Sequence, residues 1–462
     1  MFNNLSCDKL KEECGVMGVY RNTMDDVAQM VYYGLFALQH RGQESAGIAT
    51  NDGNMPYFHK GMGLVNEVFN DEIFRSLKGN IGIGHVRYST TGESYINNAQ
   101  PLVVKYRRGS IGLAHNGNLV NAPLIRSGLE DDGVVFQTTI DSEVIVNLIA
   151  RYSSDGIPTA IERTMDLIKG AYSLVIMTEG ELIGVRDPHG LRPLCIGKLE
   201  DGYVIASESC GLDSVGAELI RDVEPGEIVI INQEGIRSIK LNKEYKKASC
   251  IFEYIYFARP DSVIDGVGVY QARKNAGEIL AKEHPVEVDM VIAVPDTSIP
   301  AAIGYSEALG IPFSEGFIKN RYIGRTFIQP DQSMRELAVR LKLNPLRSNI
   351  IGKRVVMIDD SIVRGTTSKQ IVNTLKRAGA KEVHVRISSP PVAYSCYYGI
   401  DTPDNKQLIG AVKTIEEIRQ AIGADSLGYI SPEGLKRSVG IANDPYCTAC
   451  FCGDYPLEIP LR

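Results

Sequence analysis

Residues 355–368, VVMIDDSIVRGTTS, constrain the fold more than any other segment of the sequence. An apolar run ends in two adjacent carboxylates, Asp359 and Asp360, and a turn of small residues then leads into a helical pattern, KQIVNTLKRAG. A strand, a turn and a helix in this order form the unit of a parallel α/β sheet, which binds ligands outside the carboxyl ends of its strands. The segment therefore predicts a parallel sheet with a ligand site at that edge.

The sequence after about residue 245 continues this pattern, because apolar runs typical of buried strands alternate with helical patterns. The expected strands cover residues 288–294, 354–358 and 382–387, and the expected helices cover residues 299–308, 368–378 and 414–422. We expect residues 241–462 to form an α/β domain with a parallel sheet and helices on both of its faces.

The sequence before residue 235 differs, because short alternating or apolar runs are interrupted there by glycines. The expected strands include residues 81–88, 111–115, 172–177, 181–185, 203–206 and 227–231, and the expected helices cover residues 26–39, 142–152 and 160–169. Many strands with few helices indicate a layered α+β domain. A chain of 462 residues is too long for one core. We expect a first domain over 14–240 and a seam in the polar stretch 235–247.

Composition excludes several classes of protein. The net charge of −7 disfavours a broad nucleic-acid surface, and the absence of 18 consecutive apolar residues disfavours a membrane span. The first 13 residues, MFNNLSCDKLKEE, lack the apolar core of a secretory signal. Nine cysteines are too few for a disulfide scaffold. We expect a cytoplasmic protein whose cysteines are core residues, metal ligands or nucleophiles.

The turn after the two carboxylates suits a phosphate group, because it offers backbone N–H groups and hydroxyls at a helix N-terminus. The turn comprises Arg364, Gly365, Thr366, Thr367 and Ser368. The neighbouring carboxylates can hold ribose hydroxyls or a hydrated Mg²⁺. The plainer alternative is a strand end and a helix that Asp and Thr merely cap. Other nucleotide motifs are missing: there is no GxxxxGK[ST], and residues 61–63 and 82–84 lack the third glycine of a dinucleotide loop.

The whole string 355–368 resembles the phosphoribosyl diphosphate motif of the type I phosphoribosyltransferases. The resemblance implies that Asp359, Asp360 and residues 364–368 bind phosphoribosyl diphosphate. Residues 295–298 (PDTS) also follow an expected strand and should lie at the same sheet edge. The resemblance implies that this loop contacts the diphosphate and that Thr297 lies with the two carboxylates near Mg²⁺.

Residues 319–347 are basic inside an acidic protein, with seven positive side chains against two negative ones, a sum of +5. The positive residues are Lys319, Arg321, Arg325, Arg335, Arg340, Lys342 and Arg347, and the negative ones are Asp331 and Glu336. A solvated helix face is one explanation. A mobile basic flap over a highly anionic substrate explains the segment better.

Cys14 begins the string CGVMGVY, and HRGQESAGIAT, GHVRYSTTG, LAHNGNLVN and TTIDSEVI follow it in this order. Together these segments resemble the class II glutamine amidotransferases, whose nucleophile is an N-terminal cysteine. The resemblance implies an αββα sandwich over about residues 14–240. It also implies that Cys14 is the nucleophile, that Asn116 and Gly117 form the oxyanion hole, and that the glutamine pocket contains Arg87 for the α-carboxylate, Asp141 for the α-ammonium, and Thr90.

Residues 1–13 bear on the chemistry of Cys14. A thiol of ordinary pKa needs a base to form the nucleophilic thiolate. No histidine is spaced from Cys14 in a way that indicates such a base. A free α-amine, with a pKa of about 8, can take the thiol proton directly. As an internal residue, Cys14 carries an amide instead. We therefore expect residues 1–13 to be a propeptide rather than a frayed tail, although the family also has members without a leader.

Cys447 and Cys450 form a CxxC pair, and Cys250 and Cys396 lie far upstream. Four thiolates from distant segments can hold Zn²⁺ or an iron–sulfur cluster, and an unmetallated pair is the plainer alternative. One branch of the amidotransferase family has both a propeptide and a [4Fe–4S] cluster at these places. The resemblance to that branch implies the cluster on these four cysteines. Cys452 lies so close to Cys450 in the sequence that the choice of ligands is ambiguous. Cys7, Cys195 and Cys210 are expected to be spare or core thiols.

The two halves together resemble the amidophosphoribosyltransferase family. The resemblance implies that ammonia from glutamine displaces diphosphate from C1 of phosphoribosyl diphosphate, which opens purine nucleotide synthesis. It also implies inhibition by purine nucleotides and a homotetramer, with no nucleic-acid or membrane partner. One alternative is a class II glutaminase with another acceptor, which residues 355–368 oppose. Another is a non-catalytic phosphoribosyl diphosphate sensor that controls transcription, but we find no DNA-binding motif in the sequence.

Overall fold

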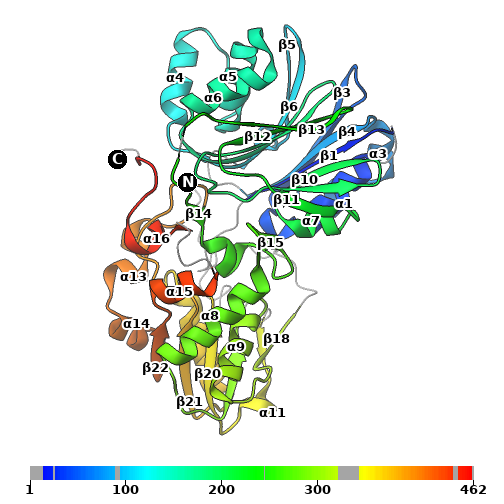
Figure 1. Ribbon diagram of the computed structural model, residues 1–462. Coiled ribbons are helices and arrows are strands. Elements are labelled where there is room, and N and C mark those ends of the chain that lie inside the picture. Colours follow the sequence, from blue (N-terminus) through cyan, green and yellow to red (C-terminus); the bar gives the residue numbers. More distant parts are fainter. Residues whose placement is uncertain are drawn as a thin grey trace.

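The computed structural model describes residues 14–23, 27–88, 94–243, 245–320, 343–440 and 446–459. Within these ranges the chain forms two parts, one above the other in Figure 1. We call them the N-terminal half, from β1 to β13 (residues 15–240), and the C-terminal half, from β14 (Ser249–Cys250) onward. None of the helices in the described ranges is long and apolar enough to cross a membrane.

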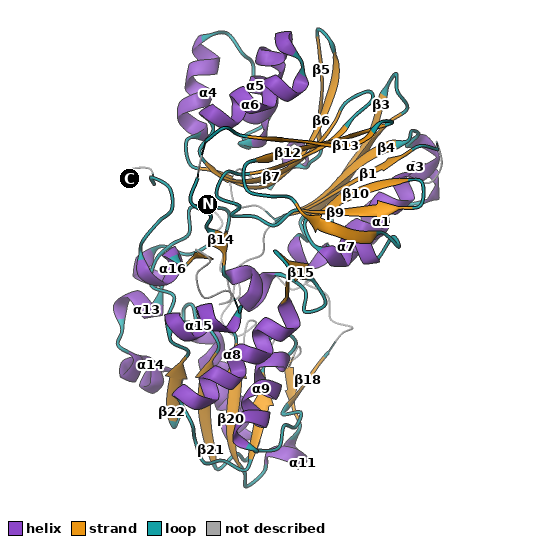
Figure 2. Ribbon diagram, viewed as in Figure 1, coloured by secondary structure: helices purple, strands orange, loops and turns teal. Residues whose placement is uncertain are grey.

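The described part of the N-terminal half contains an antiparallel sheet of seven strands. In spatial order the strands are β11 (Glu218–Asp222), β9 (Cys195–Leu199), β10 (Gly202–Ala206), β1 (Gly15–Arg21), β4 (Ile81–Arg87), β2 (Ser45–Asn51) and β3 (Pro56–Met62). Four helices pack on its outer face: α1 (Val27–Ala37), α2 (Val65–Val68), α3 (Asp71–Ser76) and α7 (Ser209–Asp213). Figure 2 shows α1, α3 and α7 on one side of the sheet.

A second antiparallel sheet, of six strands within the described ranges, faces the first. Its strands, in spatial order, are β13 (Gly235–Lys240), β12 (Glu227–Asn232), β8 (Leu182–Arg186), β7 (Gly170–Met177), β6 (Gly109–Leu119) and β5 (Leu102–Tyr106). Its outer face is covered by α4 (Ala122–Asp131), α5 (Ser142–Tyr152) and α6 (Ile157–Leu167). The four layers confirm the αββα sandwich predicted from the sequence.

Strand β1 shows how the sequence produces these layers. Its side chains alternate between the two faces of the sheet, as the period of a strand requires. Val16 and Tyr20 pack between the two sheets, whereas Met17 and Val19 pack under the outer helices. Both faces are therefore buried, which explains why the strand reads as a continuous apolar run.

The C-terminal half is built on a parallel sheet of four strands in the described ranges. The strands are β17 (Met290–Ala293), β20 (Arg354–Asp359), β21 (Glu382–Ile387) and β22 (Ser426–Tyr429). One face packs against α8 (Val269–Glu283), α9 (Ile299–Leu309) and α15 (Pro432–Ser438), and the other against α12 (Thr366–Arg377) and α14 (Ile415–Ile422). Helices on both faces confirm the predicted α/β half.

Short elements complete both halves. Strand β14 pairs in parallel with β23 (Tyr446–Cys447), and β15 (Val263–Ile264) pairs with β16 (Val267–Gly268). The other elements are η1 (Gln39–Arg41), η2 (Ile96–Asn98), η3 (Ser153–Asp155), the π-helix η4 (Glu253–Phe257), β18 (Phe317–Lys319), β19 (Leu343–Pro345), α11 (Arg347–Ile350), η5 (Asn405–Gln407), α13 (Ile409–Val412) and α16 (Ala449–Cys452).

Candidate functional site

Cys14 immediately precedes β1, whose first residue, Gly15, pairs with Val86 of β4. The Cys14 thiol is buried and donates a 3.5 Å hydrogen bond to the carbonyl oxygen of Tyr88. Burial raises the pKa of this thiol to about 11, although the Arg87 guanidinium opposes the shift. Such a thiol is almost wholly protonated at neutral pH, so nucleophilic chemistry at this position requires a base.

Arg87 ends β4 beside Cys14, and only 3% of its side chain is exposed. Its Nη1 forms an ion pair with the carboxylate of Glu44, and the Glu44 backbone N–H donates to the Arg87 carbonyl oxygen over 3.0 Å. Glu44 was not among the predicted site residues, although it lies inside the segment HRGQESAGIAT. The charges of Arg87, Glu44 and Asp141 all act on the Cys14 thiol, so these side chains gather around it.

Asn116 and Gly117 lie on β6, opposite Ser173 and Tyr172 of β7. Asn116 is fully buried, and among the described residues neither its Oδ1 nor its Nδ2 has a hydrogen-bond partner. Gly117 has a φ of +145°, and a Cβ there would stand 2.0 Å from the carbonyl oxygen of Ala171. The chain therefore holds an amide with unused hydrogen-bonding capacity next to a backbone position that only glycine fits.

Asp141 is buried near the same strand. Its Oδ2 accepts a 2.8 Å hydrogen bond from the Leu119 N–H, and its Oδ1 lies 3.6 Å from Nδ1 of His115. Burial alone would raise the pKa of Asp141, but His115 and the hydrogen bonds lower it below its ordinary value. The carboxylate is thus held as an anion that suits an ammonium group.

Two histidines that the sequence analysis did not single out connect the facing sheets. His85 on β4 donates from Nε2 to the carbonyl oxygen of His115 on β6, over 3.0 Å. Burial lowers the pKa of His85 to about 3, so its ring is neutral. His115 Nδ1 lies 3.0 Å from the Ser142 hydroxyl, at the start of α5. The strings GHVRY and LAHNG contained these residues, but sequence spacing gave no sign that they meet.

Arg41, in η1, connects Cys14 to the other half of the molecule. Its Nε donates to the Cys14 carbonyl oxygen over 3.2 Å, and its Nη1 lies 2.5 Å from Oε1 of Glu208. Its Nη2 lies 2.7 Å from Oε1 of Glu253, the first residue of η4. Burial would raise the pKa of Glu208, but His40 and Arg41 hold it well below its usual range. All of these ionic side chains except His40 are almost fully buried.

The second predicted site lies at the carboxyl edge of the parallel sheet. Asp359 ends β20, and both it and Asp360 are 1% exposed. Asp359 Oδ1 accepts hydrogen bonds from the Asp360 N–H over 2.9 Å and from the Ser298 hydroxyl over 3.4 Å. Ser298 and its neighbour Thr297 belong to the loop after β17, so the structure brings the two predicted loops together. Buried carboxylates beside hydroxyls are oxygen ligands of the kind that Mg²⁺ prefers.

The turn after Asp360 leads into α12 through Gly365, whose φ is +83°. A Cβ at Gly365 would stand 2.7 Å from Cδ1 of Ile409. Thr366, Thr367 and Ser368 form the first turn of this helix of 12 residues. The N–H groups of a first helical turn point outward and attract anions, which fits the predicted phosphate site.

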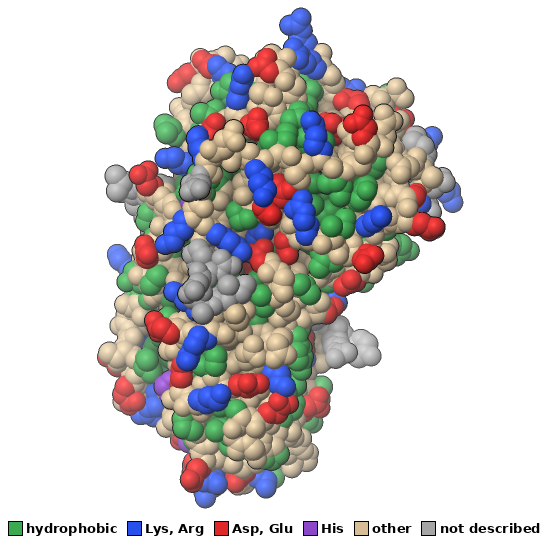
Figure 3. All heavy atoms as spheres, viewed as in Figure 1, with side chains coloured by type: hydrophobic (Ala, Val, Ile, Leu, Met, Phe, Trp, Pro, Cys, Tyr) green, Lys and Arg blue, Asp and Glu red, His purple; other side chains and the backbone are tan. Residues whose placement is uncertain are grey.

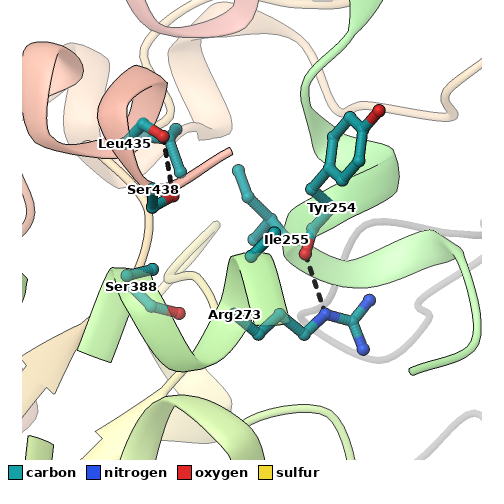
Figure 4. A pocket seen from close by; sticks show the side chains of 8 residues that line it. Tyr254, Ile255, Arg273, Ser388, Leu435 and Ser438 are labelled. Atoms are coloured by element: carbon teal, nitrogen blue, oxygen red, sulfur yellow. Dashed lines mark hydrogen bonds between the residues drawn. The ribbon is translucent and has the colours of Figure 1, made fainter. Parts of the chain in front are cut away.

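A small cavity lies between η4, α8 and α15, and Figure 4 shows the side chains that line it. The buried Arg273 donates from Nε to the Tyr254 carbonyl oxygen over 2.8 Å and from Nη2 to that of Ala258 over 2.7 Å. Burial lowers the pKa of Arg273 to about 10, and the negative charge of Asp360 opposes this shift more than any other carboxylate does. The buried Arg273 thus binds two backbone carbonyls of the segment around η4, and nothing in the sequence indicated this role.

The four cysteines predicted as ligands gather from three segments. Cys250 pairs with Cys447 across β14 and β23, and the Cys450 carbonyl oxygen accepts from the N–H groups of residues 393 and 394, just before Cys396. Burial raises the pKa of the Cys450 thiol, and the other three thiols add to that shift. Among the described residues, however, no group of three or more His, Cys, Asp or Glu is arranged to hold a metal ion.

The other predicted cysteines divide by burial. Cys195, on β9, and Cys210, in α7, are buried in the core that also contains residues of α1, as expected of core thiols. Cys452 is exposed, and its thiol donates to the Thr448 carbonyl oxygen over 3.3 Å. Thr90, Cys7, residues 1–13 and most of the basic stretch 319–347 lie outside the described residues.

On the face shown in Figure 3, Lys and Arg side chains are interspersed with Asp and Glu.

Comparison with known proteins finds a matching domain family within each half of the chain. A glutamine amidotransferase domain family matches residues 85–214, and a phosphoribosyl transferase domain family matches residues 269–388. Amidophosphoribosyltransferase of Archaeoglobus fulgidus is 53% identical over 97% of this chain and 98% of its own length. Amidophosphoribosyltransferase of Bacillus subtilis is also 53% identical, over 97% of this chain and 95% of its own length.

Solved structures agree over the same length. The glutamine phosphoribosylpyrophosphate amidotransferase from B. subtilis, complexed with ADP and GMP, superposes with a TM-score of 0.91 at 52% identity, and the match covers 97% of this chain and 98% of that one. A structure described as the allosteric regulatory enzyme of purine biosynthesis superposes with a TM-score of 0.92, also at 52% identity and over 97% of both chains.

Proposed function

The chain belongs to the amidophosphoribosyltransferase family, and on that premise we propose that it transfers ammonia from glutamine to C1 of phosphoribosyl diphosphate. The products are 5-phosphoribosylamine, diphosphate and glutamate, and the reaction is the first step of purine nucleotide synthesis. The observation that carries the proposal is the presence of two separate sites in one chain. Cys14, Arg87 and Asp141 gather in the N-terminal half, and Asp359 meets the loop of Ser298 in the C-terminal half.

The proposed nucleophile is Cys14, made N-terminal by removal of residues 1–13. The free α-amine takes the proton from the buried thiol, and the thiolate attacks the side-chain amide carbon of glutamine. The Asn116 side-chain N–H and the Gly117 backbone N–H stabilise the oxyanion that develops. The α-ammonium of Cys14 returns its proton to the leaving nitrogen, so collapse of the intermediate releases ammonia and leaves a glutamyl thioester, which water hydrolyses to glutamate and the free thiol.

The proposed glutamine pocket uses opposite charges to orient the amino acid. Arg87, held by Glu44, binds the α-carboxylate, and Asp141 binds the α-ammonium. Thr90 lines the same pocket in this proposal. The lowered pKa of Asp141 supports its part, because the carboxylate must stay ionised in a buried place to attract a cation.

The proposed acceptor site is the carboxyl edge of the parallel sheet. Residues 364–368 hold the 5-phosphate at the N-terminus of α12, and Asp359 and Asp360 hold the ribose hydroxyls. Thr297 and the two carboxylates are the proposed Mg²⁺ site, and a bound Mg²⁺ would neutralise charge on the departing diphosphate. Ammonia passes inside the protein between the sites, because in water near neutral pH it would be protonated and lost.

Several finer features are part of the same proposal. The chain divides into a propeptide, residues 1–13, a glutaminase domain, residues 14–240, and a phosphoribosyltransferase domain, residues 241–462. We propose a cytoplasmic homotetramer that purine nucleotides inhibit. The nucleotides in the B. subtilis relative, ADP and GMP, support the choice of inhibitor class.

We also propose that Cys250, Cys396, Cys447 and Cys450 hold a [4Fe–4S] cluster that ties the C-terminal segment to the rest of the half. The backbone contacts that join the segments of these cysteines support this proposal, since thiolates are the ligands of such clusters. Anaerobically purified protein should contain iron and acid-labile sulfide in equal amounts. Zinc without sulfide, or no metal, would contradict the proposal.

The central test is the variant Cys14→Ala. It should lose the synthesis of phosphoribosylamine with glutamine but keep the synthesis with ammonium salts, because the acceptor site is separate. Loss of both activities in a folded protein would contradict the two-site scheme. Mass spectrometry of active wild-type protein should find Cys14 as the first residue. An intact Met1 in fully active enzyme would contradict the propeptide.

A further inference from the structure

A loop of the C-terminal half, Tyr397–Gly399, lies directly against the strand that carries the proposed oxyanion hole. Asn118, one residue after Gly117, donates from Nδ2 to the Tyr397 carbonyl oxygen over 2.8 Å. Gly399 approaches so closely that a Cβ on it would stand 3.3 Å from the Gly117 carbonyl carbon. Its φ of +109° is also a conformation that favours glycine. Two glycine backbones therefore touch where the halves meet.

Arg192 holds this loop in place from the N-terminal half. Its side chain is 1% exposed, and both Nε and Nη2 donate to the Tyr398 carbonyl oxygen, the first over 3.1 Å. Its Nη1 lies 3.9 Å from Oε1 of Glu253, the carboxylate that also pairs with Arg41. A guanidinium that donates two hydrogen bonds to one carbonyl oxygen fixes the distance between the loop and the strand.

The backbone of Arg192 is anchored beside the same strand. Its carbonyl oxygen accepts hydrogen bonds from the Ser173 hydroxyl over 3.3 Å and from Nε of Arg186 over 2.8 Å. Ser173 is the direct partner of Asn116 in the pairing of β7 with β6. Arg192 thus contacts the neighbour of Asn116 with its backbone and, with its side chain, the loop that covers Gly117.

We propose that Arg192 is a positioning residue for the release of ammonia from glutamine. By pressing residues 397–399 against β6, it fixes the direction of the Gly117 backbone N–H at the place where the oxyanion forms. Arg192 itself does not touch the glutamine. The inference rests on the proposed glutaminase function and adds that the geometry of the oxyanion hole is set by a loop of the other half.

The test is Arg192→Lys in the full-length mature enzyme, because lysine keeps the charge but cannot place two donors on one carbonyl. We expect the kcat for glutamine hydrolysis to fall about tenfold or more, as for a weakened oxyanion donor, while the KM for glutamine stays within about twofold, since only transition-state binding is affected. Synthesis with ammonium salts should match the wild type. Arg221→Lys, on the edge strand β11, is the matched control and should change none of these quantities.

Alkylation of Cys14 by iodoacetamide separates positioning from a general loss of structure. Alkylation needs the nucleophile but no oxyanion hole, so Arg192→Lys should be alkylated at the wild-type rate. A variant with wild-type kcat for glutamine, or with equal losses in alkylation, glutamine hydrolysis and ammonia-dependent synthesis, would overturn the inference. A wild-type enzyme that hydrolyses no glutamine would instead overturn the proposed function.

Asn118→Asp provides a second route if Arg192→Lys does not fold. The aspartate keeps the shape of the side chain but loses the donor to the Tyr397 carbonyl oxygen. It should show the same pattern, with a smaller fall in kcat for glutamine and unchanged ammonia-dependent synthesis. Wild-type glutamine kinetics in a folded Asn118→Asp enzyme would contradict the role of the loop.

Discussion

The backbone carbonyl of Cys14 and the guanidinium of Arg41 are joined by a 3.2 Å hydrogen bond. The remaining donors of Arg41 reach Glu208 in the N-terminal half and Glu253 in the C-terminal half. Cys14, which immediately precedes β1, is thereby held by a buried ionic cluster that spans the two halves. The orientation of Cys14 therefore depends in part on Glu253, a carboxylate of the other half.

Removal of the Arg41 charge, at the centre of this cluster, should destabilise the protein strongly. Arg41→Met keeps much of the volume but leaves Glu208 and Glu253 buried without their cation, which should cost about 3–5 kcal/mol of unfolding free energy. Arg21→Met is the matched control, because Arg21 pairs with Asp201 near the surface, and such pairs contribute about 0–1 kcal/mol. Urea denaturation of both variants measures the difference, and equal losses would contradict a structural role for the buried cluster.

Asn116→Ala should separate catalysis from stability. The amide has no hydrogen-bond partner among the described residues, so its removal should cost little unfolding free energy. The kcat with glutamine should fall by about 10²–10³ if the amide is an oxyanion donor. Asn98→Ala is the control: Asn98 is also buried, but it exchanges hydrogen bonds with Thr139, and its loss should cost about 1–3 kcal/mol. A stable Asn116→Ala enzyme with wild-type kcat would contradict the assignment.

The parts of the molecule that could be predicted from sequence are those whose causes are local. The strand, turn and helix around Asp359 follow one another along the chain, and the apolar runs at residues 172–177 and 227–231 are strands β7 and β12. The loop of Ser298 could be placed beside Asp359 because the carboxyl ends of neighbouring parallel strands share an edge. In these cases the period of the sequence and the topology of the sheet suffice.

The contacts that hold the catalytic groups in place could not be predicted in this way. Arg41 and Glu253 are 212 positions apart, and nothing in the spacing of either shows that they meet. The same is true of Asn118 and the Tyr397 carbonyl, which are 279 positions apart. Glu44 belongs to the segment HRGQESAGIAT, which resembles the amidotransferases, but its pairing with Arg87 depends on the register of β2 against β4.

Asp359→Asn should abolish the synthesis of phosphoribosylamine with either nitrogen source, because it removes a charge that the proposed acceptor site needs for the ribose and Mg²⁺. Glutamine hydrolysis at the distant Cys14 site should persist. Asp289→Asn, a partly exposed aspartate paired with Arg354, is the control and should leave both activities intact. The two reactions are measured separately, as diphosphate released and as glutamate formed. An Asp359→Asn enzyme that still releases diphosphate with ammonia would contradict the proposed acceptor site.

Gly365→Ala should weaken the binding of phosphoribosyl diphosphate. The residue needs a φ of +83°, and its Cβ would stand 2.7 Å from Cδ1 of Ile409, so either the turn or the Ile409 side chain must move. The KM for phosphoribosyl diphosphate should rise at least about tenfold, as a displaced phosphate site implies. Gly216→Ala, which also has a positive φ but open space around it, controls for backbone strain alone. An unchanged KM would mean that the turn does not bind the phosphate.

Stability should depend on pH through Asp222, at the end of β11. Burial and the neighbouring Asp265 carboxylate raise the pKa of Asp222 to about 6, although Arg186 opposes the shift. A raised carboxyl pKa means that the folded protein binds this proton more tightly than the unfolded chain does. The native state therefore loses stability as the pH rises from about 4 through 6, by at most about 3 kcal/mol at 1.36 kcal/mol per pKa unit.

Asp222→Asn removes this titration, so its unfolding free energy should exceed that of the wild type at pH 8, and the gain should shrink toward pH 4. Asp201→Asn should behave in the opposite way, because the hydrogen bond from Arg21 lowers the pKa of Asp201. That variant should lose a small amount of stability at pH 8, and the loss should fade as the pH falls below 4. Urea denaturation across this range measures both. If the gain in unfolding free energy of Asp222→Asn did not vary between pH 4 and pH 8, Asp222 would be ionised in the folded protein throughout this range.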